Sequence, residues 1–351
     1  MNCFLCGTNR ADKKNSHVIP FFLIKSMVTP TESRRTEKDI SFDLSKLGIV
    51  QCYFGRDVSP ETINETLGRE MGKKDLEENV NPYTKDDFLC TERETKIARL
   101  ESKFSSIVYP KIFAEKRQKE DESYEPIEVD TLITLLFCYS IIWRIGSSGF
   151  GNLQIHQSIL KTLAGILNLI LATDEKDLER NLLTNKDKLL QHKIALSVDT
   201  RQEYKDGRFV FFKPDQVHPH SFYINSFYIA FYYKRSMLNN KGSNFLGLNR
   251  QFNRVKIRDS QNIQVYYPSP ERVANAVKEI LAVTSKRMSF YLASNFKAIF
   301  NHIYKVDPPA DLVSKYMSEL IFADHPPADR YSMGRIAELT AKYCNVKLEK
   351  N

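Results

Sequence analysis

Two cysteines near the start of the chain have the spacing of a metal site. Cys3 and Cys6 are separated by two residues and are followed by Gly7. Such a knuckle can place two thiolates on one tetrahedral metal ion, because glycine lets the chain turn while backbone N–H groups point at sulfur. Cys90, directly before a segment of helical character, offers a third thiolate. We predict a structural Zn²⁺ site held by Cys3, Cys6 and Cys90.

The fourth ligand of this site stays open at the level of sequence. A second cysteine pair would have its other thiol at position 93, where the chain has Arg93. Cys52, His17 or a nearby carboxylate could substitute. The alternative interpretation is that Cys3 and Cys6 are ordinary reduced cysteines at a frayed terminus.

The second candidate for chemistry is His17, in the sequence Ser-His-Val-Ile-Pro at residues 16–20. A histidine followed by two β-branched residues and a proline is typical of the end of a strand, with the imidazole at a bend. Held beside a metal ion, such a histidine can take a proton from water and make it a nucleophile towards phosphorus. A histidine alone in an apolar setting is more often structural, so this prediction depends on the neighbouring cysteines.

The order of these motifs resembles the HNH family of nucleases with the ββα-metal fold. It is most similar to an uncharacterised bacterial group in which Cys-x-x-Cys-Gly is followed by Ser-His-Ile-Ile-Pro, by Leu-Cys-x-x-Cys-Glu, and by a helix containing Ser-x-x-Trp-Arg. The corresponding elements lie here at residues 3–7, 16–20, 89–94 and 140–144. The resemblance covers about residues 1–150.

The resemblance implies an endonuclease that nicks or cuts DNA with a divalent metal ion. His17 would be the general base, and Mg²⁺ or Mn²⁺ would be the catalytic metal. The resemblance also implies that Cys3, Cys6 and Cys90 hold a separate, structural Zn²⁺.

The chain departs from the family pattern at three positions. Ser16 stands where an acidic residue commonly precedes the histidine, and Asp86 and Asp87 lie near the expected place of the family asparagine. The final His or Asn ligand on the helix is missing. Glu92 and Glu94, at the start of that helix, are therefore the remaining candidates for the catalytic site.

The elements that must position these residues change along the chain. Residues 1–95 have weak periodicity and predict short strands and loops. Apolar residues at spacings of three and four then predict a helix from Glu92 to about Gln118. Pro126 suits the first turn of a long apolar helix that contains Trp143. Two further helices are predicted over about residues 155–170 and 175–192.

The middle of the chain predicts strands. Residues 208–213 and 221–233 are dense in aromatic and β-branched residues. Arg254, Lys256 and Arg258 alternate with apolar residues, so one face of that strand would be positive. Together with Arg250 they are the predicted nucleic-acid-binding residues, because cations that neutralise phosphates release counterions and strengthen binding. The alternative is a solvated sheet face.

These patterns predict an α+β fold that is mostly α. The N-terminal part, residues 1–118, would be a small irregular zinc-knuckle/ββα module with a long insertion at about 29–87. Residues 126–351 would form an α-rich body, with a small antiparallel sheet inserted at about 208–268. Helices return after Pro270 and complete the body.

Composition sets the class of protein. The chain has 351 residues, of which 42% are hydrophobic and 27% charged, and these globular values exclude wholesale disorder, collagen-like repeats and coiled-coil fibres. Lys and Arg outnumber Asp and Glu by 51 to 43. The resulting net charge of +8 permits a polyanionic partner such as nucleic acid without requiring one.

No signal segment is apparent at the start of the sequence. The longest apolar run, residues 131–143, is shorter than the roughly 18–20 residues needed to cross a bilayer. We therefore expect a cytoplasmic protein with no membrane partner, in which cysteines are thiols or metal ligands rather than disulfides.

Three functions follow as alternatives. The leading one is the metal-dependent endonuclease, which analogy places in bacterial antiviral defence against phage. The second is a zinc-stapled, catalytically degenerate module that binds nucleic acid or protein. The third is a helical scaffold or oligomerisation subunit, in which aromatic residues at 222–233 form a protein interface for a partner or for self-association.

Overall fold

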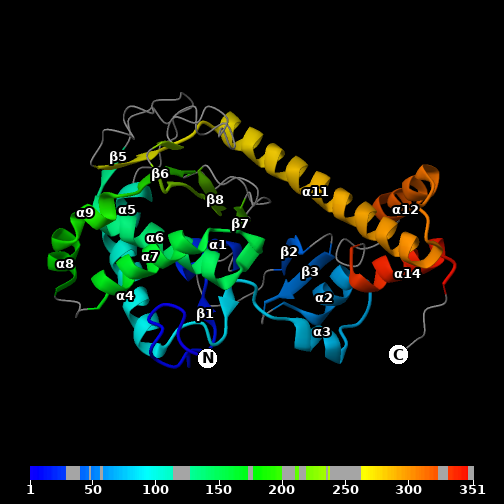
Figure 1. Cartoon of the computed structure of the whole chain (residues 1–351), viewed down its shortest axis with the longest axis horizontal. Coiled ribbons are helices and arrows are strands. Elements are labelled where there is room, and N and C mark those ends of the chain that lie inside the picture. Colours follow the sequence, from blue (N-terminus) through cyan, green and yellow to red (C-terminus); the bar gives the residue numbers. More distant parts are fainter. Residues whose placement is uncertain are drawn as a thin grey trace. The chain divides into compact units, whose positions relative to one another are not determined.

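The computed structural model divides the chain into two compact units (Figure 1). Unit 1 comprises Met1–Met27 and Tyr83–Glu279, and unit 2 comprises Val28–Pro82 and Ile280–Asn351. The predicted class, α+β and mostly α, is confirmed. The structure describes residues 1–28, 40–46, 49–55, 58–113, 127–172, 177–199, 210–212, 219–234, 236–237, 262–322 and 331–346.

Unit 1 begins with two short strands and a helix. β1 (Ser16–His17) pairs antiparallel with β4 (Thr84–Lys85), so that His17 lies opposite Thr84. α4 (Thr91–Ile107) follows β4 after a short turn. α1 (Phe21–Val28) begins directly after Pro20. Proline suits a helix start because the backbone N–H that it lacks would have no partner within the helix there. Most of the predicted insertion, the chain between β1 and β4, lies in unit 2.

α4 forms because its apolar residues recur with helical spacing and its first turn is capped from outside. Ile97, Leu100 and Phe104 are buried on one face. The backbone N–H of Thr91 donates to the Asp12 carboxylate at 2.8 Å, in place of the cap that the residue before the helix does not supply. The helix ends earlier than predicted, and a second, short helix, α5 (Tyr109–Phe113), follows it.

α6 (Thr131–Ser148) is the central helix of unit 1. Its side chains are buried without interruption from Ile133 to Ile145. It begins at Thr131 with Asp130 as cap, so the predicted start at Pro126 is wrong, and the preceding residues form the strand β5 (Ile127–Val129). By length and composition alone α6 is apolar enough to span a membrane. However, 72% of it is buried inside the structure, as expected of the core helix of a globular protein.

Other helices of unit 1 cover this core helix. α6 approaches α7 (Gln157–Ile170) closely at Gly146, where a Cβ atom would lie 2.7 Å from Leu160 Cδ2. A larger residue there would require the side chains of Leu160 and Ile155 to shift. The helix predicted over residues 175–192 is present as two short helices. The remaining helical segments are η1 (Phe150–Asn152), α8 (Leu178–Thr184) and α9 (Lys186–Leu190).

A six-stranded sheet completes unit 1. All neighbouring strands are antiparallel except β10 and β6, which run parallel, so the sheet is mixed and extends beyond the predicted 208–268 insertion. The aromatic residues of β8 and β9, predicted as an interface, are buried within the unit. The strand order is β5, β10 (Ile263–Tyr266), β6 (Lys193–Val198), β9 (Phe227–Tyr232), β8 (His220–Ile224) and β7 (Val210–Phe212).

Unit 2 has its own core. Phe296 and Tyr316 stack with ring centroids 4.2 Å apart, and Leu292, Leu320 and Leu339 surround them. Of the predicted site residues that the structure describes, Cys52, a suggested substitute for the fourth sulfur, lies in this unit. Its elements are β2 (Ile40–Lys46), β3 (Ile49–Phe54), α2 (Pro60–Leu67), α3 (Lys73–Glu78), the greater part of α11 (Pro270–Tyr304), α12 (Ala310–Phe322) and α14 (Met333–Tyr343).

A buried arginine on α6 joins the elements of unit 1 that carry the predicted site. Arg144 Nη1 donates to the backbone oxygen of His17 at 2.8 Å, and Nη2 lies 2.6 Å from Glu101 Oε1 on α4. Nη2 also donates to Ser140 Oγ at 3.3 Å. The Ser-x-x-Trp-Arg sequence is therefore a brace between α6, β1 and α4. The adjoining Trp143 stacks on Phe88, just before the third cysteine, with ring centroids 5.5 Å apart.

Breaking this brace should destabilise unit 1 far more than breaking an exposed ion pair. Glu101→Gln removes the carboxylate that pairs with the buried Arg144 guanidinium at 2.6 Å, and we expect a loss of about 3 kcal/mol in the free energy of unfolding. The measurement is urea-induced unfolding followed by tryptophan fluorescence, since Trp143 is the only tryptophan and lies in this unit.

Glu179→Gln is the matched control. It removes the partner of Lys103 at 2.7 Å, but Glu179 is 74% exposed, so its loss should cost less than about 1 kcal/mol. Equal destabilisation by the two variants would contradict the role of the brace.

Candidate metal centre and the adjoining histidine

Three cysteine sulfurs converge at the start of α4. The Sγ atoms of Cys3, Cys6 and Cys90 all lie within 4.8 Å of one another. Cys3 and Cys90 are buried, whereas Cys6 is partly exposed. Across the described part of the chain, this is the one group of three or more His, Cys, Asp or Glu side chains that could hold a metal ion. We refer to these three residues as the thiolate cluster.

The first two cysteines are positioned by a tight local loop. Gly7 has φ of +70°, a left-handed conformation that glycine adopts without strain. Its N–H donates to the backbone oxygen of Cys3 at 2.9 Å, and the N–H of Cys3 donates to the backbone oxygen of Asn9 at 2.8 Å. These bonds close the loop and turn both sulfurs to the same side, as the sequence predicted.

Long-range backbone bonds bring the third cysteine to this loop. The N–H of Phe4 donates to the backbone oxygen of Phe88 at 3.0 Å, and the N–H of Lys13 donates to that of Leu89 at 3.1 Å. Asn168 on α7 donates to the backbone oxygen of Leu5 at 2.6 Å and fixes the loop from another side. The position of Cys90 is therefore set by tertiary contacts on both sides of the cluster.

The surroundings of the sulfurs affect the ionisation of each thiol differently. Burial raises the pKa of Cys3, although nearby backbone N–H groups oppose this. Burial also acts to raise the pKa of Cys6, but hydrogen bonds from the Thr8 hydroxyl and from the N–H groups of Asn9 and Thr8 outweigh it and lower the pKa to about 6. N–H donors that stabilise a thiolate are what a thiolate metal ligand requires.

The donor set fits a soft or borderline divalent ion. Three converging thiolates in a largely buried place, with backbone N–H groups directed at sulfur, suit zinc better than magnesium or calcium, which prefer oxygen. Arg93 occupies the position of the fourth sulfur in the family pattern, and a guanidinium cannot bind a cation. Its Nε and Nη1 atoms are buried with no hydrogen-bond partner among the described residues. Cys52, one proposed substitute, lies on β3 in unit 2.

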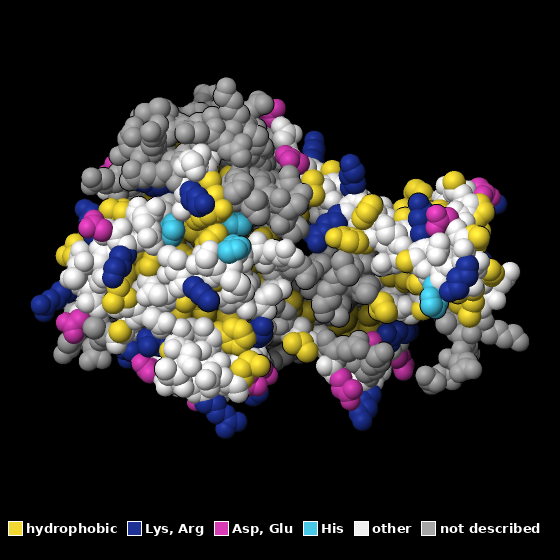
Figure 2. All heavy atoms as spheres, in the orientation of Figure 1, with side chains coloured by type: hydrophobic (Ala, Val, Ile, Leu, Met, Phe, Trp, Pro, Cys, Tyr) yellow, Lys and Arg dark blue, Asp and Glu magenta, His cyan; other side chains and the backbone are white. Residues whose placement is uncertain are grey.

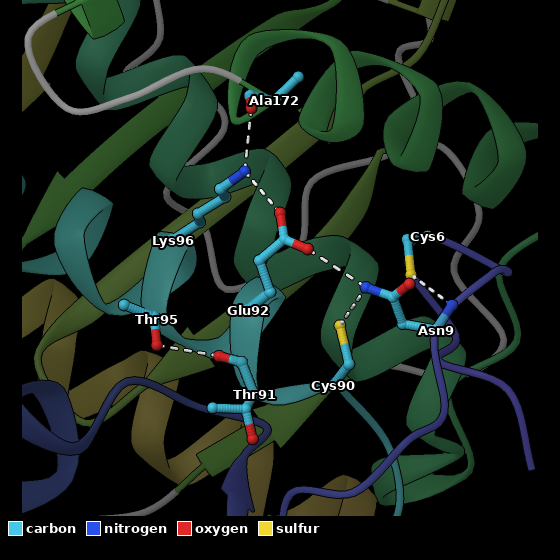
Figure 3. Close-up of polar contacts among 8 residues, drawn as sticks. All are labelled: Cys6, Asn9, Cys90, Thr91, Glu92, Thr95, Lys96 and Ala172. Atoms are coloured by element: carbon cyan, nitrogen blue, oxygen red, sulfur yellow. Dashed lines mark hydrogen bonds and ion pairs between the residues drawn. The ribbon is translucent and has the colours of Figure 1, made fainter.

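Asn9 and Glu92 lie at the edge of the thiolate cluster (Figure 3). The Asn9 side-chain amide Nδ2 is 3.8 Å from Cys90 Sγ and 3.2 Å from Glu92 Oε2, and its backbone N is 3.5 Å from Cys6 Sγ. The other oxygen of Glu92 accepts a bond of 2.7 Å from Lys96, which lowers the pKa of the Glu92 carboxyl. Glu92 therefore belongs to the surroundings of the sulfurs.

Glu94 has a different environment. It lies about 200° around the helix from Glu92. Burial raises the pKa of the Glu94 carboxyl, and Arg144 and the Ser16 hydroxyl oppose this only in part. Its Oε2 atom is buried with no hydrogen-bond partner within the described residues. A partly buried carboxylate with a raised pKa is a group of the kind that clusters at functional sites.

His17 follows Ser16 on β1. Its ring is partly buried, with its centroid 5.7 Å from that of Phe21 at the start of α1. Its backbone oxygen is fixed by Arg144. The structure thus brings β1, which carries Ser16 and His17, against the helix that carries Glu94.

The remaining predicted residues lie elsewhere. Asp86 accepts from the backbone N of Asn15 at 2.7 Å, and Asp87 pairs with Lys14 at 3.0 Å, so both acids stabilise the turn before α4. The predicted nucleic-acid-binding residues, Arg250, Arg254, Lys256 and Arg258, lie outside the described residues.

Sequence reasoning missed Asn9 as part of the cluster. Asn9 is three residues after Cys6, and its backbone N–H faces the Cys6 sulfur. The Cys-x-x-Cys-Gly spacing could therefore have predicted a residue of the cluster at this position.

Charged side chains of one sign do not gather into a single patch on the face of the molecule shown in Figure 2. On the face shown in Figure 2, basic side chains are scattered and acidic ones lie among them.

No protein-family model, curated protein or solved structure matches the chain.

Removing one sulfur should remove the metal. For Cys90→Ser we expect zinc to fall from about one equivalent to a small fraction of it, and the melting temperature of the protein to fall with it, because structural metal binding contributes directly to folding. Elemental analysis and calorimetry with and without a chelator measure both effects. Cys344→Ser is the control, since Cys344 is a buried cysteine of the unit 2 core. Full zinc content in Cys90→Ser would contradict the site.

The raised pKa of Glu94 predicts a stability effect of defined sign. The folded chain binds this proton more tightly than the unfolded chain, so the carboxyl's contribution to stability is lost as pH rises through the folded pKa. Glu94→Gln should therefore be more stable than the wild type at pH 7, and the difference should vanish below about pH 4. Urea unfolding across this pH range measures it.

Glu179→Gln gives the opposite control. The ion pair with Lys103 lowers the pKa of the Glu179 carboxyl, so this variant should lose rather than gain stability at pH 7. Loss of stability at pH 7 in Glu94→Gln would show that Glu94 is a structural acid.

Proposed function

We propose that this protein is a metal-dependent endonuclease of the HNH type, which hydrolyses phosphodiester bonds in nucleic acid. One observation supports the proposal: the antiparallel pair β1–β4 is followed by α4, on which Glu94 is a partly buried carboxylate whose environment includes Ser16, the neighbour of His17 on β1. The thiolate cluster at the start of the same helix supplies a place for structural zinc.

In this proposal each residue has a distinct task. His17, partly exposed at the end of its strand, takes a proton from the attacking water. Glu94 supplies an oxygen ligand of the kind that Mg²⁺ and Mn²⁺ prefer, and such an ion stabilises charge on the phosphoryl oxygens. Arg144 holds the backbone of His17 and, through Glu101, the helix of Glu94, so that both keep a fixed spacing.

The basic residues of 250–258 remain the proposed contacts to the phosphate backbone. A role in bacterial defence against phage fits this activity by analogy alone.

The second candidate function is a zinc-stapled module that binds nucleic acid or protein without cutting. It is favoured by Ser16, which stands where an acidic ligand precedes the histidine in the family. Glu94 would then lack a second carboxylate for a hard metal ion. This candidate predicts full zinc content and nucleic-acid binding with a steep salt dependence, but no cleavage.

The decisive experiment is cleavage of supercoiled plasmid and of single-stranded substrates by the zinc-loaded protein with Mg²⁺ or Mn²⁺. We expect His17→Ala to lower the rate by at least about 100-fold, because a general base contributes that much or more. Zinc content and the circular dichroism spectrum should not change.

His302→Ala, an exposed histidine in unit 2, is the control and should cut like the wild type. Cleavage by His17→Ala at the wild-type rate would overturn the role of His17. Zinc-loaded wild type that binds but never cuts would favour the second candidate.

A further inference from the structure

The thiolate cluster has three ligands where a structural zinc ion takes four. Structural zinc sites are tetrahedral and closed, so a cluster of three sulfurs needs one more donor. Arg93 stands in the position of the missing sulfur and cannot supply it. The fourth donor must therefore come from a neighbour of a different type.

A carboxylate lies one amide group away from the sulfurs. The Asn9 side chain connects the two: its Nδ2 is 3.8 Å from Cys90 Sγ and 3.2 Å from Glu92 Oε2 (Figure 3). An N–H₂ group that faces both a sulfur and a carboxylate occupies the place that a cation bound by both would take. The contact therefore marks a position at which Glu92 and Cys90 can share one positively charged partner.

The helix presents Glu92 to the cluster in a defined orientation. Glu92 is in the first turn of α4, two residues after Cys90, so the two donors share one rigid element. Its Oε1 accepts from Lys96 at 2.7 Å, one turn further along, while Oε2 faces Asn9. Lys96 is itself anchored to the backbone oxygen of Ala172 at 2.9 Å. This resembles the usual support of a carboxylate ligand, in which one oxygen is held by a donor; here the other oxygen accepts only from the Asn9 amide among the described residues.

Neighbouring groups offset part of the negative charge of such a site. Three thiolates and one carboxylate around Zn²⁺ leave an excess of two negative charges. Lys96 offsets one of them directly, and the N–H groups of Thr8 and Asn9 stabilise the thiolate of Cys6.

We propose that Glu92 Oε2 is the fourth ligand of a zinc ion held by Cys3, Cys6 and Cys90, and that the Asn9 amide moves aside to admit the ion. Glu92 is then a structural metal ligand and not a member of the catalytic site, which keeps Glu94. The inference rests on the zinc part of the proposed function and is independent of cleavage.

The test replaces zinc by Co²⁺, whose visible d–d absorption reports the ligand set of a tetrahedral site. In Glu92→Gln we expect shifted d–d bands and a metal affinity lower by about tenfold or more, because even outer partners of a ligand have effects of that size. Asp12→Asn is the matched control: it removes another carboxylate at the same helix end, one that contacts Thr91 and not the cluster. Its bands and affinity should equal those of the wild type.

A second variant tests the same position by introducing a stronger metal ligand there. Glu92→Cys should restore the affinity and give a stronger sulfur-to-cobalt charge-transfer band, since four thiolates then bind the ion. This readout does not require Glu92→Gln to fold well.

Unchanged bands and affinity in Glu92→Gln would overturn the assignment, as would an equal shift in Asp12→Asn or a three-sulfur spectrum in Glu92→Cys. Failure of the zinc proposal itself looks different, because the wild type would then bind neither Co²⁺ nor Zn²⁺ stoichiometrically. Loss of cleavage alone, with normal cobalt spectra, would concern the nuclease proposal only.

Discussion

The buried guanidinium of Arg144 is the constraint on which the site of unit 1 depends. A charge inside the core requires partners in fixed places, and here they are the backbone oxygen of His17, the carboxylate of Glu101 and the hydroxyl of Ser140. These partners come from β1, α4 and α6. Because one planar group bonds to all of them, the strand with the histidine and the helix with the acidic residues cannot shift independently.

Because Arg144 fixes α4 in this way, the two glutamates at the start of α4 lie in different surroundings. Its first turn has two different surroundings: Glu92 contacts Asn9, which in turn contacts Cys90, whereas Glu94 is partly buried near Ser16 and Arg144. One helix thus has the third cysteine of the thiolate cluster directly before it and a partly buried carboxylate, Glu94, in its first turn. Cys90, just before the helix, fixes the register between the two, so that zinc at the cluster would also hold the helix against β1.

Local patterns account for most of the helices and for the knuckle. Apolar residues at spacings of three and four predicted α4, and the Cys-x-x-Cys-Gly spacing predicted the loop of Cys3 and Cys6. Both could be predicted because each depends on residues that are close in the chain. The start of α6 was misplaced because Asp130 caps the helix from its side chain, and a proline a few residues earlier is an equally good start by sequence alone. The sheet was placed too narrowly, since β5 and β6 join it by pairing with strands distant in sequence.

The sequence by itself determined the class of the fold, the knuckle and the nature of the candidate donors. Only the tertiary structure decided which donors meet. Cys90 reaches the knuckle through backbone bonds of Phe88 and Leu89 to residues near the N-terminus, and these join segments more than 70 residues apart. In the sequence, nothing distinguishes Glu92 from Glu94, since both lie in the first turn of the same helix. They became different because burial and Arg144 act on one, while Asn9 and Lys96 act on the other, and such contacts arise only when the chain has folded.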